Sequence, residues 1–383
     1  MAFSPVPRQA RRAFLLAGLG AVLALAGCQT GPRRPLPGPS PVGPGPTTPI
    51  DTQRNLVAVI VPLSGGEGAV GQSIANAANL ALLDSGDKSL RITVYDSAAP
   101  GGAAAAATRA IAEGNRLFLG PLLAEDVRAA APIARRAGVP LVAFSNDQSV
   151  AGRGVYIMGF TPDQSIDRVV RHARGKGMAR FGVLVPTGLY GQRASQAMIG
   201  AVRSQGGRII GLEQFARSTA GVRAAAARLR AKGAFDAVLI GDAGRIAAIA
   251  APALPPAAKF LGTELWASDK TLGRTPALRG AWYAAAPDAR FNQLTTRYRA
   301  RYGKAPYRLA SLGYDAVLLA VRSSKNWPVG RPFPAAGLIA RDGFSGVDGN
   351  FRFGRDGIAE RLLEVRQVSA TGTTTVSAAG KAF

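Results

Sequence analysis

The residues that could bind a nucleotide come first in the folded part of the chain. Gly66, Gly68 and Gly71 have the G-x-G-x-x-G spacing between an apolar run and a helical pattern, and Asp96 ends the next apolar run. In dinucleotide-binding proteins such glycines let a pyrophosphate approach a helix N-terminus, and the acid binds a ribose. Here residues 62–65 separate the strand from the first glycine, which argues against that site. No lysine follows Gly71, so the phosphate loop of nucleotide hydrolases is absent too.

No combination of residues indicates catalysis or a metal site. The chain has one cysteine, Cys28, and one histidine, His172, which excludes an intrachain disulfide and a Cys/His metal cluster. Ser345 lies in G-F-S-G, but Val347 occupies the last glycine position of a nucleophile elbow. We therefore expect a non-enzymatic protein without a metal or a cofactor.

Size and charge limit the architecture and the partners. At 383 residues the chain exceeds one ordinary core, which predicts two domains. Lysine and arginine outnumber aspartate and glutamate by 47 to 23, so the formal net charge is +24. The arginines fall singly or in pairs, as at Arg135 and Arg136, and no run interleaves them with aromatic residues. This distribution predicts a solvated basic surface and no nucleic-acid partner.

The first 54 residues are predicted to export and tether the protein. Arg11 and Arg12 precede a short apolar run, and this order predicts a signal peptide over residues 1–27. The two arginines also resemble a twin-arginine signal, so export by the Sec pathway and by the twin-arginine pathway both stay open. The run ends in L-A-G-C, which resembles the bacterial lipobox, in which Cys28 becomes the lipid-modified first residue. Residues 28–54 are rich in proline and glycine and suit a tether. We expect a periplasmic protein anchored by lipid to the inner or the outer membrane.

Apolar runs of strand length alternate with helical patterns along the folded part. This alternation predicts an α/β fold with helices on both faces of a parallel sheet. After residue 161 the series starts again, so we expect two similar lobes. Strands are predicted at 56–61, 90–95, 117–119, 139–144, 155–160, 180–185, 208–213, 237–240 and 259–261. The tail predicts helices at 290–302 and 311–323, a hairpin at 344–353, a strand at 359–368 and a frayed end at 371–383.

Four short motifs lie along the folded part of the chain. They are P-L-S-G at 62–65 followed by G-Q, G-P-L at 120–122, A-P-I-A at 131–134 with G-V-P, and Y-G at 190–191. As a set they resemble type I periplasmic solute-binding proteins of the leucine/isoleucine/valine-binding kind. The resemblance implies two doubly wound parallel-sheet lobes joined by three crossovers, which close on a ligand by hinge motion. We place lobe 1 at 55–161 plus about 285–331, and lobe 2 at 162–284 plus about 332–370.

A further stretch narrows the resemblance. F-S-N-D-Q-S-V-A-G at 144–152, with Tyr156 and G-F-T-P at 159–162, is similar to the penicillin-binding-protein activators. These are lipoproteins of alphaproteobacteria that share the solute-binding fold and are thought to regulate peptidoglycan synthases. The resemblance therefore implies a regulatory function in cell-wall synthesis.

The sequence departs from the amino-acid binders of this fold. Such binders usually offer Ser/Thr hydroxyls after the third and fourth strands to the ligand carboxylate, and an acid of the second lobe to its ammonium. Here Leu123 and Ala124 replace the first hydroxyls, Ser145 remains, and residues 275–279 contain no acid. A charged α-amino acid without these partners would lose several kcal/mol on burial, so either the ligand differs or the cleft is vestigial.

These observations predict a lipid-anchored, two-lobed binding protein that activates a penicillin-binding protein and so regulates peptidoglycan synthesis. The alternative is the substrate-binding component of an ABC transporter for amino acids or another small polar ligand. The partner would be a peptidoglycan synthase in the first case and an ABC permease in the second. The residues predicted to line the interdomain cleft all lie in loops at strand ends: Ser64, Ser145, Asn146, Asp147, Tyr190 and Trp266.

Overall fold

The computed structural model describes residues 51–383. The expected signal peptide, the anchor at Cys28 and most of the tether lie outside this range. Among residues 51–383, no helix combines the length and the apolar composition that crossing a membrane requires.

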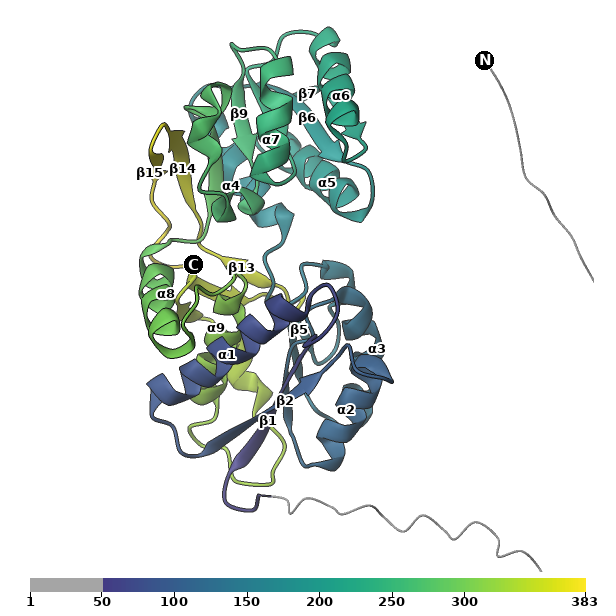
Figure 1. Cartoon of the computed structure of the whole chain (residues 1–383), viewed down its shortest axis with the longest axis vertical. Helices are drawn as coiled ribbons and strands as arrows, with labels where there is room; N and C mark the ends of the chain where they lie inside the picture. Colours follow the sequence, from purple (N-terminus) through teal and green to yellow (C-terminus); the bar gives the residue numbers. More distant parts are fainter. Residues whose placement is uncertain (1–50) are drawn as a thin grey trace, which may run out of the picture. The chain divides into compact units, whose positions relative to one another are not determined.

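The first lobe is built on a five-stranded parallel sheet (Figure 1). Its strand order is β2-β1-β3-β4-β5, the order of a doubly wound sheet. The strands are β1 (Asn55–Val61), β2 (Leu90–Asp96), β3 (Leu117–Leu119), β4 (Leu141–Ala143) and β5 (Val155–Ile157). The helices are α1 (Gly68–Ser85), α2 (Gly102–Ala112), α3 (Ala124–Arg136), α8 (Ala289–Tyr302) and α9 (Ala310–Ser323).

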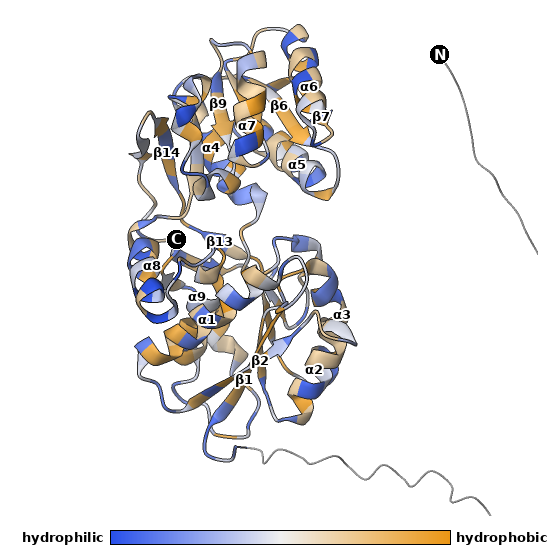
Figure 2. Ribbon diagram, in the orientation of Figure 1, coloured by the Kyte–Doolittle hydropathy of each residue, from blue (hydrophilic) through white to orange (hydrophobic). Residues whose placement is uncertain are grey.

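Strand β1 shows why the sheet is covered on both faces. All seven of its residues are buried. Val57, Val59 and Val61 pack with α1 and α9, whereas Ala58 and Ile60 pack with α2 and α3. Side chains alternate between the faces of a strand, so a continuous apolar run needs helices on both sides. Figure 2 shows the corresponding apolar colouring of the central strands.

The second lobe repeats this plan on a seven-stranded sheet. Its order is β15-β14-β10-β9-β8-β6-β7, in which β14 and β15 run antiparallel. The strands are β6 (Arg180–Pro186), β7 (Arg208–Phe215), β8 (Ala237–Ile240), β9 (Lys259–Gly262), β10 (Trp282–Ala285), β14 (Glu364–Ser369) and β15 (Gly372–Ser377). The helices are α4 (Pro162–Gly175), α5 (Leu189–Ser204), α6 (Thr219–Ala231) and α7 (Gly244–Ala250).

In both lobes a glycine lies in the first turn of the helix that follows the first strand, α1 in the first lobe and α5 in the second. A Cβ on Gly71 would lie 1.7 Å from the carbonyl oxygen of Pro62, and one on Gly191 would lie 1.7 Å from that of Pro186. In each lobe the helix therefore packs directly on the end of the first strand, where only glycine fits. Gly71, the last glycine of the G-x-G-x-x-G spacing, therefore has a packing role.

The chain passes between the lobes after β5, after β10 and after the short sheet β11 (Phe344–Gly346), β12 (Gly349–Phe353) and β13 (Ala359–Arg361). The predicted fold class, two parallel-sheet lobes with three crossovers, is confirmed. The details of the last crossing differ from the sequence-based boundaries. The sequence pattern predicts that lobe 2 includes about 332–370, but Phe333, Leu338, Val347 and Phe351 belong to the core of the first lobe. Local pattern cannot tell which lobe a hairpin packs on, so this boundary had to come from the tertiary contacts.

The tail differs as well. The predicted strand at 359–368 is divided between β13 of the first lobe and β14 of the second. Residues 372–377, within the segment expected to fray, form β15 and pair with β14. Three consecutive threonines and a valine in β15 are β-branched, and such residues suit an exposed edge strand.

Candidate functional site

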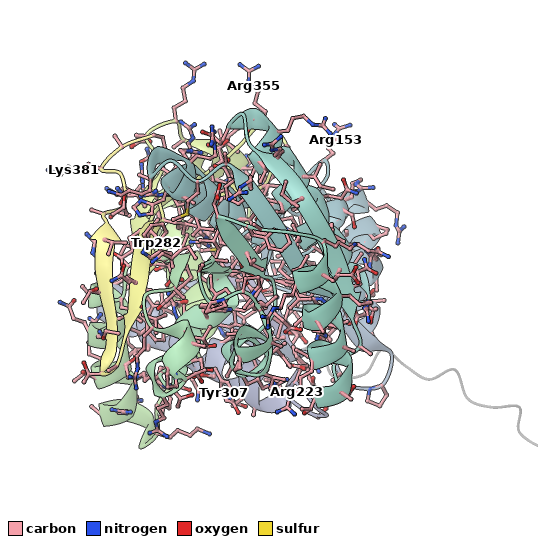
Figure 3. The ribbon with its side chains drawn as sticks, turned by 90° about the horizontal axis from the view of Figure 1, so that it is seen from above. Arg153, Arg223, Trp282, Tyr307, Arg355 and Lys381 are labelled. Carbon is pink, nitrogen blue, oxygen red and sulfur yellow. The ribbon has the colours of Figure 1, made fainter. Side chains whose placement is uncertain are left out.

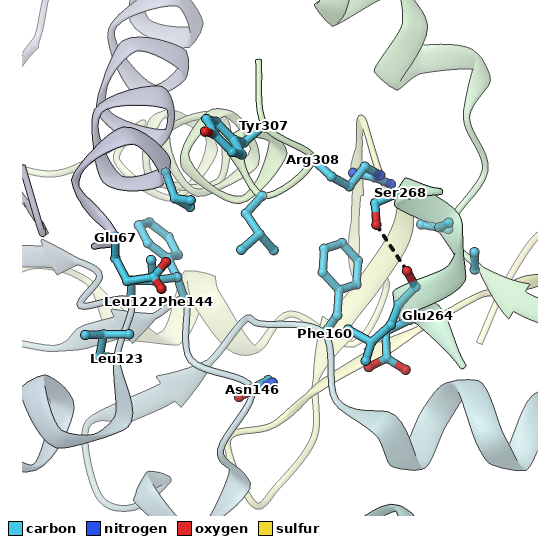
Figure 4. Close-up of a pocket in the computed structure, with 16 residues that line it drawn as sticks. Glu67, Leu122, Leu123, Phe144, Asn146, Phe160, Glu264, Ser268, Tyr307 and Arg308 are labelled. Carbon is cyan, nitrogen blue, oxygen red and sulfur yellow. Dashed lines mark hydrogen bonds between the residues drawn. The ribbon is translucent and has the colours of Figure 1, made fainter. Parts of the chain in front are cut away.

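A cavity of about 450 Å³ is lined by residues of both lobes (Figure 4). Almost every segment that contributes to it follows the carboxyl end of a strand, where doubly wound sheets bind their ligands. The first lobe and its crossovers contribute Glu67, Val70, Leu122, Leu123, Phe144, Asn146, Phe160, Tyr307, Arg308 and Leu309. The second lobe contributes Glu264, Leu265, Ala267, Ser268, Ala285 and Ala286.

The wall of this cavity is mainly apolar. Leu122 and Leu123 follow β3, Phe144 follows β4, and Phe160 lies in the first crossover. These side chains can cover an apolar body, and the volume is in the range of small-molecule sites, roughly 300–1,000 Å³. Leu123, which stands after β3 where amino-acid binders have a hydroxyl, thus contributes to an apolar side of the cavity.

Glu264 is the carboxylate that the second lobe brings to the cavity. It opens the short 3-10 helix 264–268 after β9, and it accepts hydrogen bonds from the Ser165 hydroxyl and from the Tyr190 hydroxyl, the latter at 3.1 Å. Burial raises the pKa of Glu264 because it disfavours the charged form. A cationic group in the cavity would restore that form. The acid was expected near residues 275–279, which contain none, and it lies instead after the end of β9.

Tyr190, which was predicted to contact the ligand, donates a hydrogen bond to Glu264 instead. Its hydroxyl lies 3.0 Å from the Thr263 hydroxyl oxygen as well as contacting the Glu264 carboxylate. Burial and then the charge of Glu264 raise the pKa of Tyr190 well above its usual value, so it stays a neutral hydrogen-bond donor. Its hydrogen bonds hold the carboxylate in place.

In the segment Ser145–Asp147, one residue lines the cavity and the other two form contacts behind its wall. Asn146 is exposed and lines the cavity. The Ser145 hydroxyl is buried and accepts a hydrogen bond from the Asp147 amide at 3.1 Å. Asp147 is 1% exposed and pairs with Arg128 at 2.8 Å and with Arg193 of α5, across the lobes.

The ion pairs determine the charge state of Asp147. Burial by itself would raise the pKa of its carboxyl group. Hydrogen bonds from Arg193 and Ser149 outweigh burial and lower the pKa to about 2. Asp147 therefore carries a full negative charge at neutral pH and contributes an ionic contact between the lobes.

Ser64 and Trp266 do not line this cavity. Ser64 is exposed, and its hydroxyl is 3.4 Å from the carboxylate of Asp96, which also accepts the Leu63 amide at 2.8 Å. Trp266 is fully buried in the core of the second lobe and donates its indole N–H to the Asp242 carbonyl at 2.9 Å. Of the six predicted residues, Asn146 lines the cavity. Ser145, Asp147 and Tyr190 lie behind the wall and form hydrogen bonds or ion pairs with neighbouring residues.

Arg308 is a wall residue that sequence reasoning missed. Its guanidinium lies 4.2 Å from the ring centre of Phe291 and forms a 2.6 Å ion pair with the fully buried Asp348. It lies in the α8–α9 connection, where the sequence shows no motif. Among residues 51–383, no cluster of His, Cys, Asp and Glu could hold a metal ion.

Known proteins resemble this chain in both sequence and fold. Residues 56–373 match the periplasmic binding protein family. No curated protein sequence matches the chain. Solved structures that resemble it include a leucine-binding protein from Thermotoga maritima, with 20% identity, 85% of this chain and 99% of that one covered, and a TM-score of 0.64.

Two further structures have the same fold. One is a branched-chain amino acid ABC transporter periplasmic ligand-binding protein from Burkholderia xenovorans, with 16% identity, 85% and 96% coverage, and a TM-score of 0.71. The other is an ABC transporter solute-binding protein from R. palustris in complex with benzoate, with 18% identity, 86% and 97% coverage, and a TM-score of 0.65. Identities this low establish a common fold and leave the ligand of this chain open.

Proposed function

Because the chain belongs to the periplasmic binding protein family, we propose that it is the substrate-binding component of an ABC transporter. It would bind a small molecule in the cavity between its lobes and deliver it to a permease. The proposal rests on one observation above all: the cavity has an apolar wall and a partly buried acid, Glu264, that forms no ion pair within residues 51–383.

The charged residues of the cavity indicate the kind of ligand. Glu264 is suited to a cationic group such as an ammonium, because the ion pair would offset the cost of its burial. Within residues 51–383, Arg308 is the only basic residue that lines the cavity, and its charge is already balanced by Asp348. A ligand carboxylate therefore gains less here than a ligand ammonium. We infer a ligand with an amino group and an apolar body, such as an apolar amino acid.

Transport is favoured over the regulation of a peptidoglycan synthase. Two of the solved structures that resemble the chain are described as ABC transporter proteins. The third is described as a leucine-binding protein, and none of the three is described as a synthase activator. The lipid anchor at Cys28 remains a prediction, since this residue lies outside the described range.

Titration calorimetry of the full mature chain tests the proposal. We would compare leucine, isoleucine and benzoate with the wild type, with Glu264→Gln and with Glu125→Gln, an exposed α3 residue outside the cavity as the control. Loss of one member of a buried charge pair costs about 2 kcal/mol or more, so Glu264→Gln should weaken binding of the amino acid about thirtyfold. The control should bind as the wild type does.

Two results would contradict the proposal. Tight binding of benzoate that is indifferent to Glu264→Gln would show that the site selects an anion. Binding of none of these molecules, together with retention of a purified peptidoglycan synthase in a pull-down, would restore the regulatory hypothesis.

A further inference from the structure

A second hollow lies on the first lobe and shares no residue with the interlobe cavity. Its volume is about 1170 Å³. Three segments form it: the turn before β5, the end of the 3-10 helix 335–339 with Arg341, and the β12–β13 turn. We call it the arginine groove. Its basic residues are Arg153, Arg341, Arg352 and Arg355, and its acidic residues are Asp356 and Glu360.

The acidic residues of the arginine groove are engaged locally. Glu360 forms a 2.7 Å ion pair with Arg352 across the β12–β13 hairpin. Asp356 accepts the Ile358 amide at 3.0 Å within the turn. The remaining three arginines, Arg153, Arg341 and Arg355, are exposed and form no ion pair within residues 51–383.

The groove also offers apolar surface. Ile339 is 49% exposed at its rim. Tyr156 is half-buried, and its ring centre lies 5.3 Å from that of the buried Phe353. A groove that combines unpaired guanidinium groups with apolar contacts differs from a uniformly solvated basic surface, because a bound chain can pair with the charges and cover the apolar side chains at once.

We propose that the arginine groove binds an extended acidic segment of a protein partner. Guanidinium groups bind carboxylates through two parallel hydrogen bonds, and three unpaired ones in one groove repel each other until anions enter. The hollow shape favours a chain over a bilayer, since a flat lipid surface cannot follow a concave wall. This site is separate from the ligand cavity, so it would dock the protein on its partner without occupying the ligand site.

A direct binding experiment with the full mature chain tests this. The probes are a fluorescently labelled oligo-glutamate peptide and, separately, vesicles that contain phosphatidylglycerol. Binding is measured by fluorescence anisotropy and by vesicle sedimentation, at low and at physiological salt. The groove variant replaces its three unpaired arginines: Arg153→Gln, Arg341→Gln and Arg355→Gln.

The control variant removes the same charge elsewhere. It replaces three exposed arginines that form no ion pair within the described range: Arg223→Gln, Arg230→Gln and Arg299→Gln. Figure 3 shows Arg153 and Arg355 on one side of the molecule and Arg223 on the opposite side. We expect the groove variant to bind the peptide about tenfold more weakly, since each exposed pair contributes modestly, and the control to bind as the wild type does.

Three outcomes would overturn the proposal. Equal weakening in both variants would mean that only the net charge attracts the peptide. Absence of peptide binding at low salt would show that the groove takes no acidic chain. Binding of vesicles but not of peptide, lost only in the groove variant, would assign the groove to the membrane surface. Unchanged melting temperatures show that each variant is folded.

Discussion

The ionic contact of Asp147 gives the sharpest test of the structure. We consider Asp147→Asn, which keeps the size of the side chain but removes its charge. The carboxylate pairs with Arg128 and Arg193, and its pKa is lowered from 3.8 to about 2. A shift of that size corresponds to about 2.4 kcal/mol, at 1.36 kcal/mol per pKa unit. The Arg128 side chain is 54% exposed, so we expect a screened loss of about 1–2 kcal/mol at neutral pH.

The dependence on pH follows from the direction of the shift. The pKa of Asp147 is lower in the folded than in the unfolded protein. Its contribution to the free energy of unfolding is therefore complete above about pH 5 and disappears as the pH falls toward about 2. The difference between wild type and Asp147→Asn should shrink over the same interval. Urea unfolding at pH 7, 4 and 2.5, followed by tryptophan fluorescence, measures it.

A surface carboxylate provides the control. Asp342 is 73% exposed and pairs with Arg322 at 2.7 Å, so Asp342→Asn should change the free energy of unfolding by less than about 0.5 kcal/mol. Equal losses in the two variants would refute the argument that burial and the interlobe contact matter. A loss at Asp147 that is the same at pH 7 and pH 2.5 would refute the electrostatic explanation.

Three other substitutions, with Gly66→Ala as a control, test the packing and the buried groups. Gly71→Ala places a Cβ 1.7 Å from a backbone oxygen and should cost about 3 kcal/mol, whereas Gly66→Ala, with no atom within 4 Å, should be nearly neutral in thermal melting. Burial and the nearby Asp348 raise the pKa of Asp315 to about 7, so wild-type stability should fall as the pH rises from about 4 to 7, and Asp315→Asn should flatten that decline. Trp266→Phe leaves the Asp242 carbonyl without its indole donor and should cost about 1–3 kcal/mol of stability while ligand affinity in calorimetry stays unchanged.

Local pattern was sufficient for strands β1 to β9, whereas β10 was not predicted and β14 and β15 were predicted wrongly. The run predicted at 56–61 is β1 (Asn55–Val61), and that at 180–185 is β6 (Arg180–Pro186). Each is a continuous apolar segment buried between two layers of helices, so its signal lies within a few neighbouring residues. The repeat of the series also predicted the second lobe.

The cavity could be predicted only in outline. Its position at the strand ends followed from the fold class, and Asn146 from its place after β4. Trp266 follows β9 in the same way but turns into the core, because its loop folds into a short 3-10 helix. Arg308 reaches the wall from a connection between helices, about 165 residues after the end of β4, and no spacing in the sequence indicates such a contact.

The contacts between the crossovers explain why Glu264 is a better probe of ligand recognition than the apolar wall. Phe160 lines the cavity, but its ring also lies 4.6 Å from the guanidinium of Arg361, at the start of the third crossover. Arg361 donates to the Met158 carbonyl of the first crossover, so a change at Phe160 disturbs two crossovers as well as the wall. The hydrogen bonds of Glu264 stay within the second lobe, on Ser165 and Tyr190. Substitution of Glu264 therefore changes the charge that a ligand meets, while the contacts between the crossovers stay in place.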